Sequence, residues 1–539
     1  TTDGSEPAVD NPLATLVPAD SGQVAPEAVV HVERTTNLRA TAVKPEYLSA
    51  NIDSQTYLFL ADVLGQPELD RDVIDNTLPG YGIEEALLSI PTISLTTATA
   101  NLFDPTIGIM SHPGSKGESW ERATSVELIY PDGRDGFQID AGLRIHGGIS
   151  RNDSFSFKRS FRLFFREEYG AGKLEYPLFA DTTVSRFDQL VLRASSTDSW
   201  AVVEWPPTPE GFLRWQREQA SYIRDQWMKD TQLALGQPSA HGTYVHLFLN
   251  GTYWGQYTLM ERPIDSFQAE HFGGDKGDYD VVHDCPQECG LQAGTFDMWN
   301  AMMALAAEGL ETTAKYQRIQ GNNPDGTLNP DYPTYVDVEN LIDYMIPHVA
   351  FGADDYPQHN WWAARQHGIE QGASRSAGFR FFIWDQEISN NSLDKMNNAS
   401  GVTPYEQAVA FNSPSYLYDR MRQNPDFQRR FGDRVHALFF NGGALTPENN
   451  RARWKSRAAE IDHAIVAESA RWGDARRSTP YRREVEWLAD EAWMDLYWEE
   501  NHPIAIQRFR NVGLYPTVDA PTFSQHGGPI RAGFVLEMF

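Results

Sequence analysis

The sequence predicts an α+β fold in which strands dominate the first half of the chain and helices the second half. From about residue 91 to 261, short apolar runs alternate with polar residues and end at Gly, Pro, Asn or Asp, which is the pattern of strands. Beyond Glu261 the apolar residues recur at helical spacing. The chain has 539 residues, more than one core usually holds, so we expect one large domain and smaller pieces.

The expected strands of the first half lie in SVELIYPDG, FQIDAGLRIHGG, FKRSFRLFF and FDQLVLRA. Two more, TYVHLFLN and TYWGQYTLMER, flank Asn250-Gly251, the strongest short signal for a tight hairpin. One helix is expected among these strands, over residues 210–236, with Gly236 as its stop signal. The first half is therefore a β-rich unit that carries a single helix.

The second half contains six segments with helical periodicity. They are TFDMWNAMMALAAEG, VENLIDYMIPHVAF, SPSYLYDRMRQN, DFQRRFGDRVHALFF, RARWKSRAAEIDHAIVAESARWG and VEWLADEAWMDLYWEENHPIAIQRFRN. A β-rich part followed by a helical part is the order of a protein-kinase-like bilobal fold. We expect the β-rich N-lobe at about 97–261 and the helical C-lobe at about 262–510 of a domain over 97–510.

The two ends of the chain differ from the middle in residue composition. Residues 1–60 contain short β-prone runs among Pro, Gly, Asn and Asp, and TTDGSEPAVDNP with TTNLRATAVKPEYLSANIDSQTYLF resembles the chitobiase C-terminal-like β-sandwich module. Residues 61–96 form an expected connector, and 511–539 a Pro/Gly-rich tail leading to a further module. We therefore expect a partial β-sandwich at the N-terminus and a longer, multimodular parent chain.

Composition excludes several classes of partner. Lys and Arg total 45 and Asp and Glu total 74, a formal charge of −29, which disfavours nonspecific binding to nucleic acid or anionic lipid. No stretch resembles a membrane span. Acidic surfaces suit extracellular settings. Cys285 and Cys289, in HDCPQECG, are expected to close a local disulfide, with a zinc pair as the alternative.

Two segments place polar side chains where an enzyme site could form. In FGADDYPQHNWWAARQ, Asp355 and Asn360 have the spacing of the kinase catalytic loop, D-x-x-x-x-N, and in FRFFIWDQEIS an apolar strand ends at Asp385 and Glu387. Buried carboxylates are costly unless paired or bound to metal. The alternatives are an Asx turn at Asp355 and a structural ion pair at Asp385.

Seven segments together resemble the CotH kinase family. The resemblance extends over about Leu102 to Trp384, and its segments are, in order, GLRIHGGISR, FKRSFRLFFREEYGAGKLEYPLF, FDQLVLRA, YIRDQWMKD, YVHLFLNGTYWGQYTLMERP, DYPQHNWWAARQ and FRFFIWDQE. The resemblance implies an atypical protein kinase that uses ATP and Mg²⁺ without a standard glycine-rich loop. It also implies a protein hydroxyl acceptor and a secreted or cell-surface location.

The resemblance assigns roles around Mg²⁺ and the acceptor. Asp355 would orient the acceptor hydroxyl, while Asn360 and Asp385 would bind Mg²⁺, with Glu387 as a weaker ligand. The family commonly has WD-x-D where this chain has WDQE, and a Glu reaches farther than an Asp. The rival function is an inactive scaffold or adhesion module that binds partner proteins or glycans.

The residues expected to bind or cover the phosphates lie in the β-rich half. Lys158 and Arg162 occupy alternating positions of one expected strand and would face the same side; we expect Lys158 to contact the phosphates and Arg162 to support it. A solvated basic edge strand is the alternative. Arg144 and Arg151 flank the turn expected to cover the phosphates.

Two further contacts are expected around these groups. Glu218 or Asp225, seven residues apart on one helix face, would pair with Lys158. Backbone groups near Met260 and Glu261 would contact adenine, unless Glu261 and Arg262 form only a surface ion pair.

Overall fold

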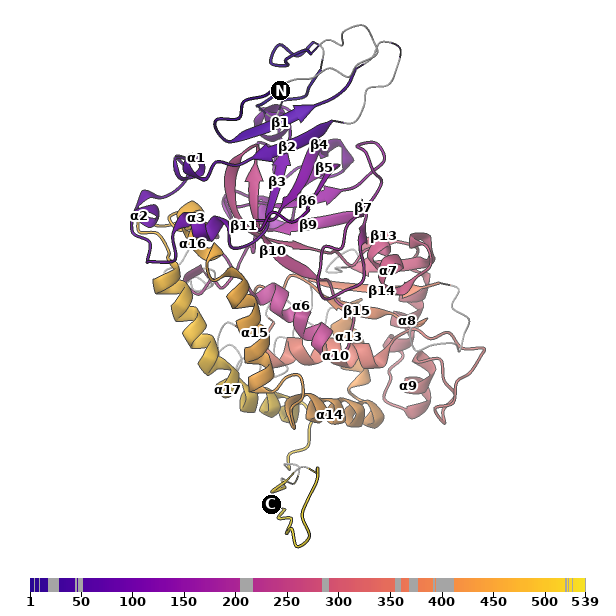
Figure 1. The fold of residues 1–539 in the computed structure, drawn as a ribbon. Coiled ribbons are helices and arrows are strands. Elements are labelled where there is room, and N and C mark those ends of the chain that lie inside the picture. The colour runs from indigo at the N-terminus through magenta and orange to yellow at the C-terminus, as the bar shows by residue number, and fades with distance from the viewer. Residues whose placement is uncertain are drawn as a thin grey trace.

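The computed structural model describes most of the chain. The described residues are 1–3, 5–8, 10–17, 29–43, 46, 52–203, 217–283, 290–353, 360–367, 377–390, 393, 412–518, 521, 523–525 and 527–538. Figure 1 shows strands gathered in the upper part of the molecule and helices below them. The mixed α and β content agrees with the predicted class, whereas the division into two lobes and the domain boundaries stay predictions.

A closed barrel forms the centre of the β-rich half. Its strands, in neighbour order, are β10 (Gly242–Leu249), β11 (Thr252–Met260), β9 (Gln189–Arg193), β6 (Ser160–Phe164), β5 (Phe137–His146), β4 (Arg122–Ile129) and β3 (Thr92–Thr96). All neighbours are antiparallel except β3 and β10. β3 lies at the start of the strand-rich region predicted from about residue 91, although it also falls within the expected connector 61–96, and it closes the barrel between β4 and β10. An apolar cluster that includes Leu95, Val126, Phe161 and Leu259 makes up its core.

The hairpin between β10 and β11 confirms the strongest turn signal of the sequence. Asn250 and Gly251 have φ angles of 48° and 78°, the left-handed pair that a two-residue type I′ turn requires. This turn starts the register in which Leu249 faces Thr252 and Gly242 faces Met260. The hairpin thus ends with Glu261 beside His241, where the chain leaves the barrel.

The N-terminal segment lies against the barrel. β1 (Thr36–Ala40) and β2 (Asp53–Tyr57) form one antiparallel pair, and the Thr56 N–H donates to Oε1 of Glu127 on β4 at 2.9 Å. Short helices α1 (Leu60–Leu64), α2 (Arg71–Ile74) and α3 (Ile83–Leu87) follow, the last two packed on α16. Among the described residues of 1–60, β1 and β2 are the one strand pair, with an isolated bridge between Asp3 and Asn37, so the β-sandwich module stays a prediction.

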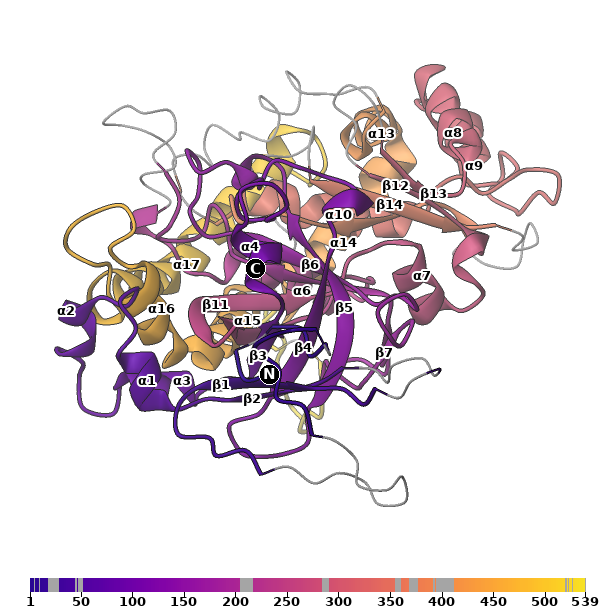
Figure 2. The same ribbon diagram turned by 90° about the horizontal axis from the view of Figure 1, so that it is seen from above.

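A second sheet and a set of helices make up the rest of the molecule. The sheet has the order β13 (Gly290–Ala293), β12 (Tyr279–His283), β14 (Trp361–Gln366), β15 (Arg380–Ile383). The larger helices are α7 (Asp265–Phe272), α8 (Asp297–Ala307), α9 (Thr313–Ile319), α10 (Val338–Ala350), α13 (Pro414–Met421), α14 (Pro425–Phe439), α15 (Pro447–Ile461), α16 (Ala464–Trp472) and α17 (Leu488–Asn511), the last preceded by a π-helical turn at Arg483–Trp487. Figure 2 shows the second sheet beside the barrel when the molecule is seen from above. Buried Trp227, Trp361, Trp454 and Trp498 belong to one large core between these helices.

Shorter elements complete the described part of the chain. They are α4 (Thr99–Phe103), β7 (Leu174–Glu175), β8 (Arg186–Phe187) and single helical turns at Glu118–Trp120, Ile149–Arg151 and Lys276–Asp278. Among the helices of the described residues, none is both long and apolar enough to cross a membrane.

The helix expected over 210–236 is shorter in the structure. α6 covers Arg224–Ala234, because Tyr222 has a φ of 65° and breaks the helix before that point. The buried carboxylate of Asp198 accepts hydrogen bonds from the N–H groups of Ser221, Ile223 and Arg224 at 2.8, 3.1 and 3.2 Å. Asp198 therefore caps α6 from a distant loop, which the local pattern of apolar residues could not reveal.

A buried ion pair joins the barrel to α16. Lys158 Nζ lies 2.7 Å from Glu468 Oε1 and donates to the carbonyl of Gln256 at 2.5 Å. Glu468 Oε2 accepts from the Gln256 N–H at 2.7 Å, and the Lys158 ammonium lies 4.6 Å from the ring centre of Tyr257. Both charged side chains are fully buried, so the contact fixes the helix on β11.

Removing Lys158 alone should destabilise the fold. Lys158→Met leaves a buried carboxylate without its counter-charge, and we expect it to lower the free energy of unfolding by about 3–5 kcal/mol. Urea denaturation measures this change. The double variant Lys158→Met/Glu468→Leu should recover much of the loss, because it removes both charges. Unchanged stability together with lost ATP affinity would instead restore Lys158 as a phosphate ligand.

Candidate active site

A pocket of about 760 Å³ lies where the barrel faces the second sheet. This volume is within the usual range for small-molecule sites, roughly 300–1,000 Å³. Its barrel side carries the cations Lys116, Arg144, Arg151, Arg162, Arg193 and Arg262. Its opposite side carries Asn360, Trp362, Trp384, Asp385 and Glu387. One pocket therefore brings together most of the polar residues that the sequence singled out.

Strand register explains why Asn360 and Asp385 lie together. Asn360 immediately precedes β14 and Asp385 follows β15, and Trp361 pairs with Ile383 in this antiparallel pair. Both residues therefore lie at the same end of this strand pair. Their φ angles of 67° and 59° are left-handed, a conformation that Asn and Asp adopt more readily than other non-glycine residues. Asn360 and Asp385 thus line one pocket, and their role as metal ligands stays a prediction.

Arg193, at the end of β9, connects three carboxylates. Its Nε lies 3.2 Å from Asp225 Oδ2 on α6 and 2.8 Å from Glu387 Oε1, and its second nitrogen pairs with Asp385. Lys229 also pairs with Asp225 from one helical turn away. Three carboxylates thus face two cations, and the excess of negative charge favours a further cation at this place.

Burial and these contacts set the protonation of the cluster. Burial would raise the pKa of Asp225, but Lys229 and Arg193 outweigh burial and lower it to about 2. Burial raises the pKa of Glu387 well above its usual value, and the neighbouring Asp385 and Asp225 raise it further, against the attraction of Arg193. Without an added cation, Glu387 therefore takes up a proton more readily than Asp225.

The barrel side of the pocket presents a wall of guanidinium groups. Arg144 and Arg162 face each other across β5 and β6, and both lie over the ring of Phe164, at 4.2 and 4.5 Å from its centre. Burial lowers the pKa of Arg162, and the nearby Arg262 and Arg144 lower it further. Arg262 lies 4.5 Å from the ring centre of Trp362 on the opposite side. Crowded cations of this kind favour a polyanionic ligand.

Arg151 supports the turn after β5 rather than covering it. Its guanidinium donates to the carbonyl oxygens of Gly147 at 2.6 Å, Pro113 at 2.9 Å and Ser115 at 2.8 Å, and also to that of Ile145. These bonds use the charge of Arg151 to hold the backbone. Arg151 thus shapes the pocket wall, and its place among the cofactor-binding residues stays a prediction.

Lys158, Met260 and Glu261 lie outside the lining of the pocket. Lys158 precedes β6, so the alternation of side chains along a strand does not place it on the same face as Arg162. Lys158 pairs with Glu468 instead of Glu218 or Asp225. The Met260 backbone is in register with Gly242 on one side and Val191 on the other. The Glu261 N–H donates to the His241 carbonyl at 3.0 Å. The Glu261 N–H is therefore already engaged, and the adenine contacts expected near Met260 and Glu261 stay a prediction.

The sequence interpretation missed Arg193 and Lys229. Arg193 occupies the place predicted for Lys158, as the cation that pairs with a carboxylate of the helix. A sequence signal for Arg193 was present, since this residue ends the apolar strand of FDQLVLRA. Lys229 lies four residues after Asp225, the spacing at which opposite charges meet on a helix.

Three predicted residues lie outside the described part of the chain. Asp355 belongs to the segment 354–359, and Cys285 and Cys289 belong to the segment 284–289. The role of Asp355 and the disulfide between the cysteines stay predictions.

Comparison with known families agrees with this site. The family model described as CotH kinase protein matches residues 210–493. This span is more than half of the 539 residues, and the chain belongs to the CotH kinase family. No curated protein matches the chain. The matched span contains Asn360, Asp385 and Glu387 and begins after the arginine wall on β5 and β6.

Asp225 should give the protein a specific acid sensitivity. Because its pKa in the folded state, about 2, lies below the ordinary value of 3.8, its stabilising effect is present above about pH 4 and is lost as the pH falls toward 2. Asp225→Asn should lower the free energy of unfolding by about 3 kcal/mol near neutral pH, and the difference from wild type should shrink below pH 4.

Urea denaturation at a series of pH values measures this effect. Glu218→Gln is the control, since Glu218 is exposed on the segment before α6 and a surface change of this kind stays within about 0.5 kcal/mol. A constant difference between Asp225→Asn and wild type from pH 6 to 2 would contradict the assignment.

Proposed function

We propose that the protein is an ATP- and Mg²⁺-dependent kinase that transfers phosphate to hydroxyl groups of proteins. The observation that carries this proposal is the polarity of the pocket, with guanidinium groups on the barrel side and oxygen ligands on the opposite side. Phosphoryl transfer needs cations on the phosphates, metal ligands and a group that positions the acceptor.

The residues at the sheet edge fit a magnesium ion. Asn360, Asp385 and Glu387 supply oxygen donors, which Mg²⁺ prefers, and the surplus negative charge around Arg193 favours a cation. The Asp385 side chain is 37% exposed and lines the pocket, so it is accessible to an entering ion. When bound, Mg²⁺ neutralises charge on the phosphate oxygens.

The phosphates are expected on the arginine wall. Arg162 and Arg144 share the face of Phe164, and Arg262 reaches the pocket from the end of the hairpin. Guanidinium groups bind phosphate through paired N–H donors. In this proposal Arg162 takes the phosphate contact first predicted for Lys158, and Asp355 orients the acceptor hydroxyl, as the family resemblance implies.

The setting of the reaction follows from the sequence. The acidic composition and the resemblance of residues 1–60 to a module of secreted bacterial proteins support a secreted or cell-surface kinase within a longer multimodular chain. The acceptor is a protein, and nucleic acid is disfavoured by the charge of −29.

One observation favours an inactive scaffold as the alternative. Arg193 pairs with Asp385 and Glu387 at once, so a protein cation occupies the carboxylates that would bind Mg²⁺. An active kinase requires Arg193 to yield one of these contacts, whereas a scaffold retains both. The two variants below separate these functions.

Asp385→Asn should abolish Mg²⁺-dependent ATP binding. The change keeps the shape of the side chain but removes the charge that attracts the metal, and the folded state should remain. Isothermal titration with ATP, with and without Mg²⁺, measures the binding. Wild type with EDTA is the matched reference. If Asp385→Asn binds Mg²⁺-ATP as wild type does, the metal assignment is wrong.

Asp355→Ala should separate binding from transfer. We expect ATP affinity to stay close to wild type and phosphoryl transfer to fall by about 10² or more, as for a lost general base. Asp354→Ala is the adjacent control and should lose far less activity. Equal losses in both variants would contradict the role of Asp355, and absence of transfer by wild type would favour the scaffold.

A further inference from the structure

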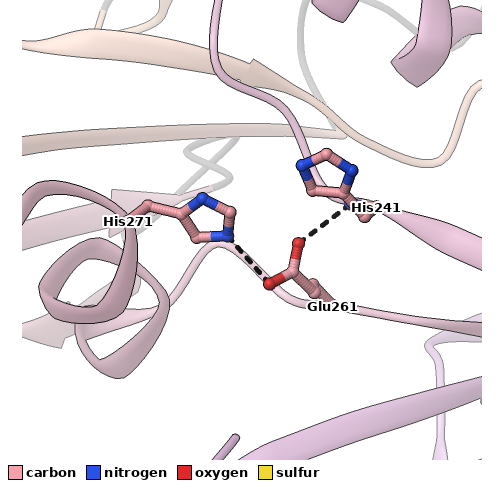
Figure 3. A group of neighbouring side chains, drawn as sticks. All are labelled: His241, Glu261 and His271. Atoms are coloured by element: carbon pink, nitrogen blue, oxygen red, sulfur yellow. Dashed lines mark hydrogen bonds and ion pairs between the residues drawn. The ribbon is translucent and has the colours of Figure 1, made fainter. Parts of the chain in front are cut away.

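A second group of metal-ligating side chains lies at the end of the β10–β11 hairpin. The ligand atoms of His241, Glu261 and His271 all lie within 4.8 Å of one another. Figure 3 shows the Glu261 carboxylate between the two histidines, one oxygen toward the His271 ring and the other toward the His241 backbone. The three side chains do not line the pocket described above.

Each ligand comes from a different element. His241 immediately precedes β10, Glu261 immediately follows β11, and His271 is in the last turn of α7. The hairpin brings the first two together, since the Glu261 N–H donates to the His241 carbonyl and Glu261 Oε2 accepts from the His241 N–H, both at 3.0 Å. Glu261 Oε1 then lies 2.8 Å from Nε2 of His271. The group therefore joins the barrel to the first helix beyond it.

The side chains are more buried than is usual for surface histidines. Exposed fractions are 7% for His241, 3% for Glu261 and 12% for His271. The two imidazole rings are parallel, with centres 5.7 Å apart and an interplanar angle of 1°. Asp181 Oδ1 lies 2.9 Å from Nδ1 of His241, the position of a carboxylate that orients a metal-bound histidine through its other ring nitrogen.

The donor set selects a type of metal. Two imidazoles and one carboxylate are the ligands of open zinc sites, whereas Mg²⁺ and Ca²⁺ prefer oxygen alone. In a tetrahedral zinc site with bonds of about 2.0–2.1 Å, ligand atoms lie about 3.3 Å apart. Small side-chain movements therefore bring a group that already lies within 4.8 Å to this spacing.

We propose that His241, Glu261 and His271 bind a zinc ion that fastens α7 to the end of the β10–β11 hairpin, with the fourth position open to water. The site is separate from the proposed magnesium site and does not depend on kinase activity. It also bears on the pocket, because Arg262, the next residue after Glu261, lines the pocket and lies over Trp362. Zinc would hold this arginine in place.

Metal titration of the full chain tests the proposal. After chelator treatment, the protein is titrated with Zn²⁺ against a chromophoric chelator and, separately, with Co²⁺ while the visible absorption of tetrahedral cobalt is followed. We expect one tight zinc per chain and a rise in melting temperature on zinc addition. His271→Ala and Glu261→Gln should each weaken zinc binding by about 100-fold or more, since even orienting neighbours of ligands contribute about 10–100-fold.

Two controls identify the site. His31→Ala removes an exposed histidine and should bind zinc as wild type does. Asp385→Asn should also retain the tight zinc, even if it loses Mg²⁺-ATP, which separates failure of this site from failure of the proposed function. Absence of tight zinc and of the cobalt spectrum in wild type would overturn the proposal, as would zinc affinity unchanged in both His271→Ala and Glu261→Gln. Either result would leave a hydrogen-bonded His–Glu–His group.

Discussion

The contact of Arg193 with three carboxylates is the interaction on which the rest of the site depends. The guanidinium comes from the barrel, Asp225 from α6, and Asp385 and Glu387 from the chain beyond β15. Taking so many charges out of water is costly unless each finds a partner. The arrangement therefore fixes the barrel, α6 and the second sheet relative to one another, and it does so at the wall of the pocket.

The same cluster explains the opposite polarities of the two pocket walls. Arg193 neutralises part of the charge on the sheet side, while Arg144, Arg162 and Arg262 leave the barrel side strongly cationic. A nucleotide with its metal has matching parts, anionic phosphates and a divalent cation. The aromatic rings of Phe164 and Trp362 hold these arginines in the wall through cation–π contacts. Arg144 also pairs with Glu121, and Arg162 donates to Gln189 Oε1, so these two guanidinium groups are fixed on the protein side as well.

Local patterns predicted the elements well and their long-range partners poorly. The Asn250-Gly251 turn, the strands β4, β5, β6, β9, β10 and β11 and most of the later helices could be predicted from periodicity and turn residues, because each depends on neighbours in sequence. The proximity of Asn360, Asp385 and Glu387 followed from the family resemblance. Lys158 was placed wrongly because it precedes β6 and its partner, Glu468, is 310 residues away. No spacing rule reaches across such a distance, and the same holds for the cap that Asp198 gives to α6.

That separation of 310 residues between Lys158 and Glu468 also constrains how the protein can assemble. A ribosome completes all barrel strands once Met260 has emerged, but the counter-charge for the buried lysine and the helix that covers β11 are synthesised roughly two hundred residues later. Until α16 is present, the part of β11 that it covers and the Lys158 ammonium lack their partner, so the buried ion pair forms late. The strands of the β-rich half are therefore all synthesised before the charge partner of Lys158. The last structural component of this half is supplied by the far end of the chain.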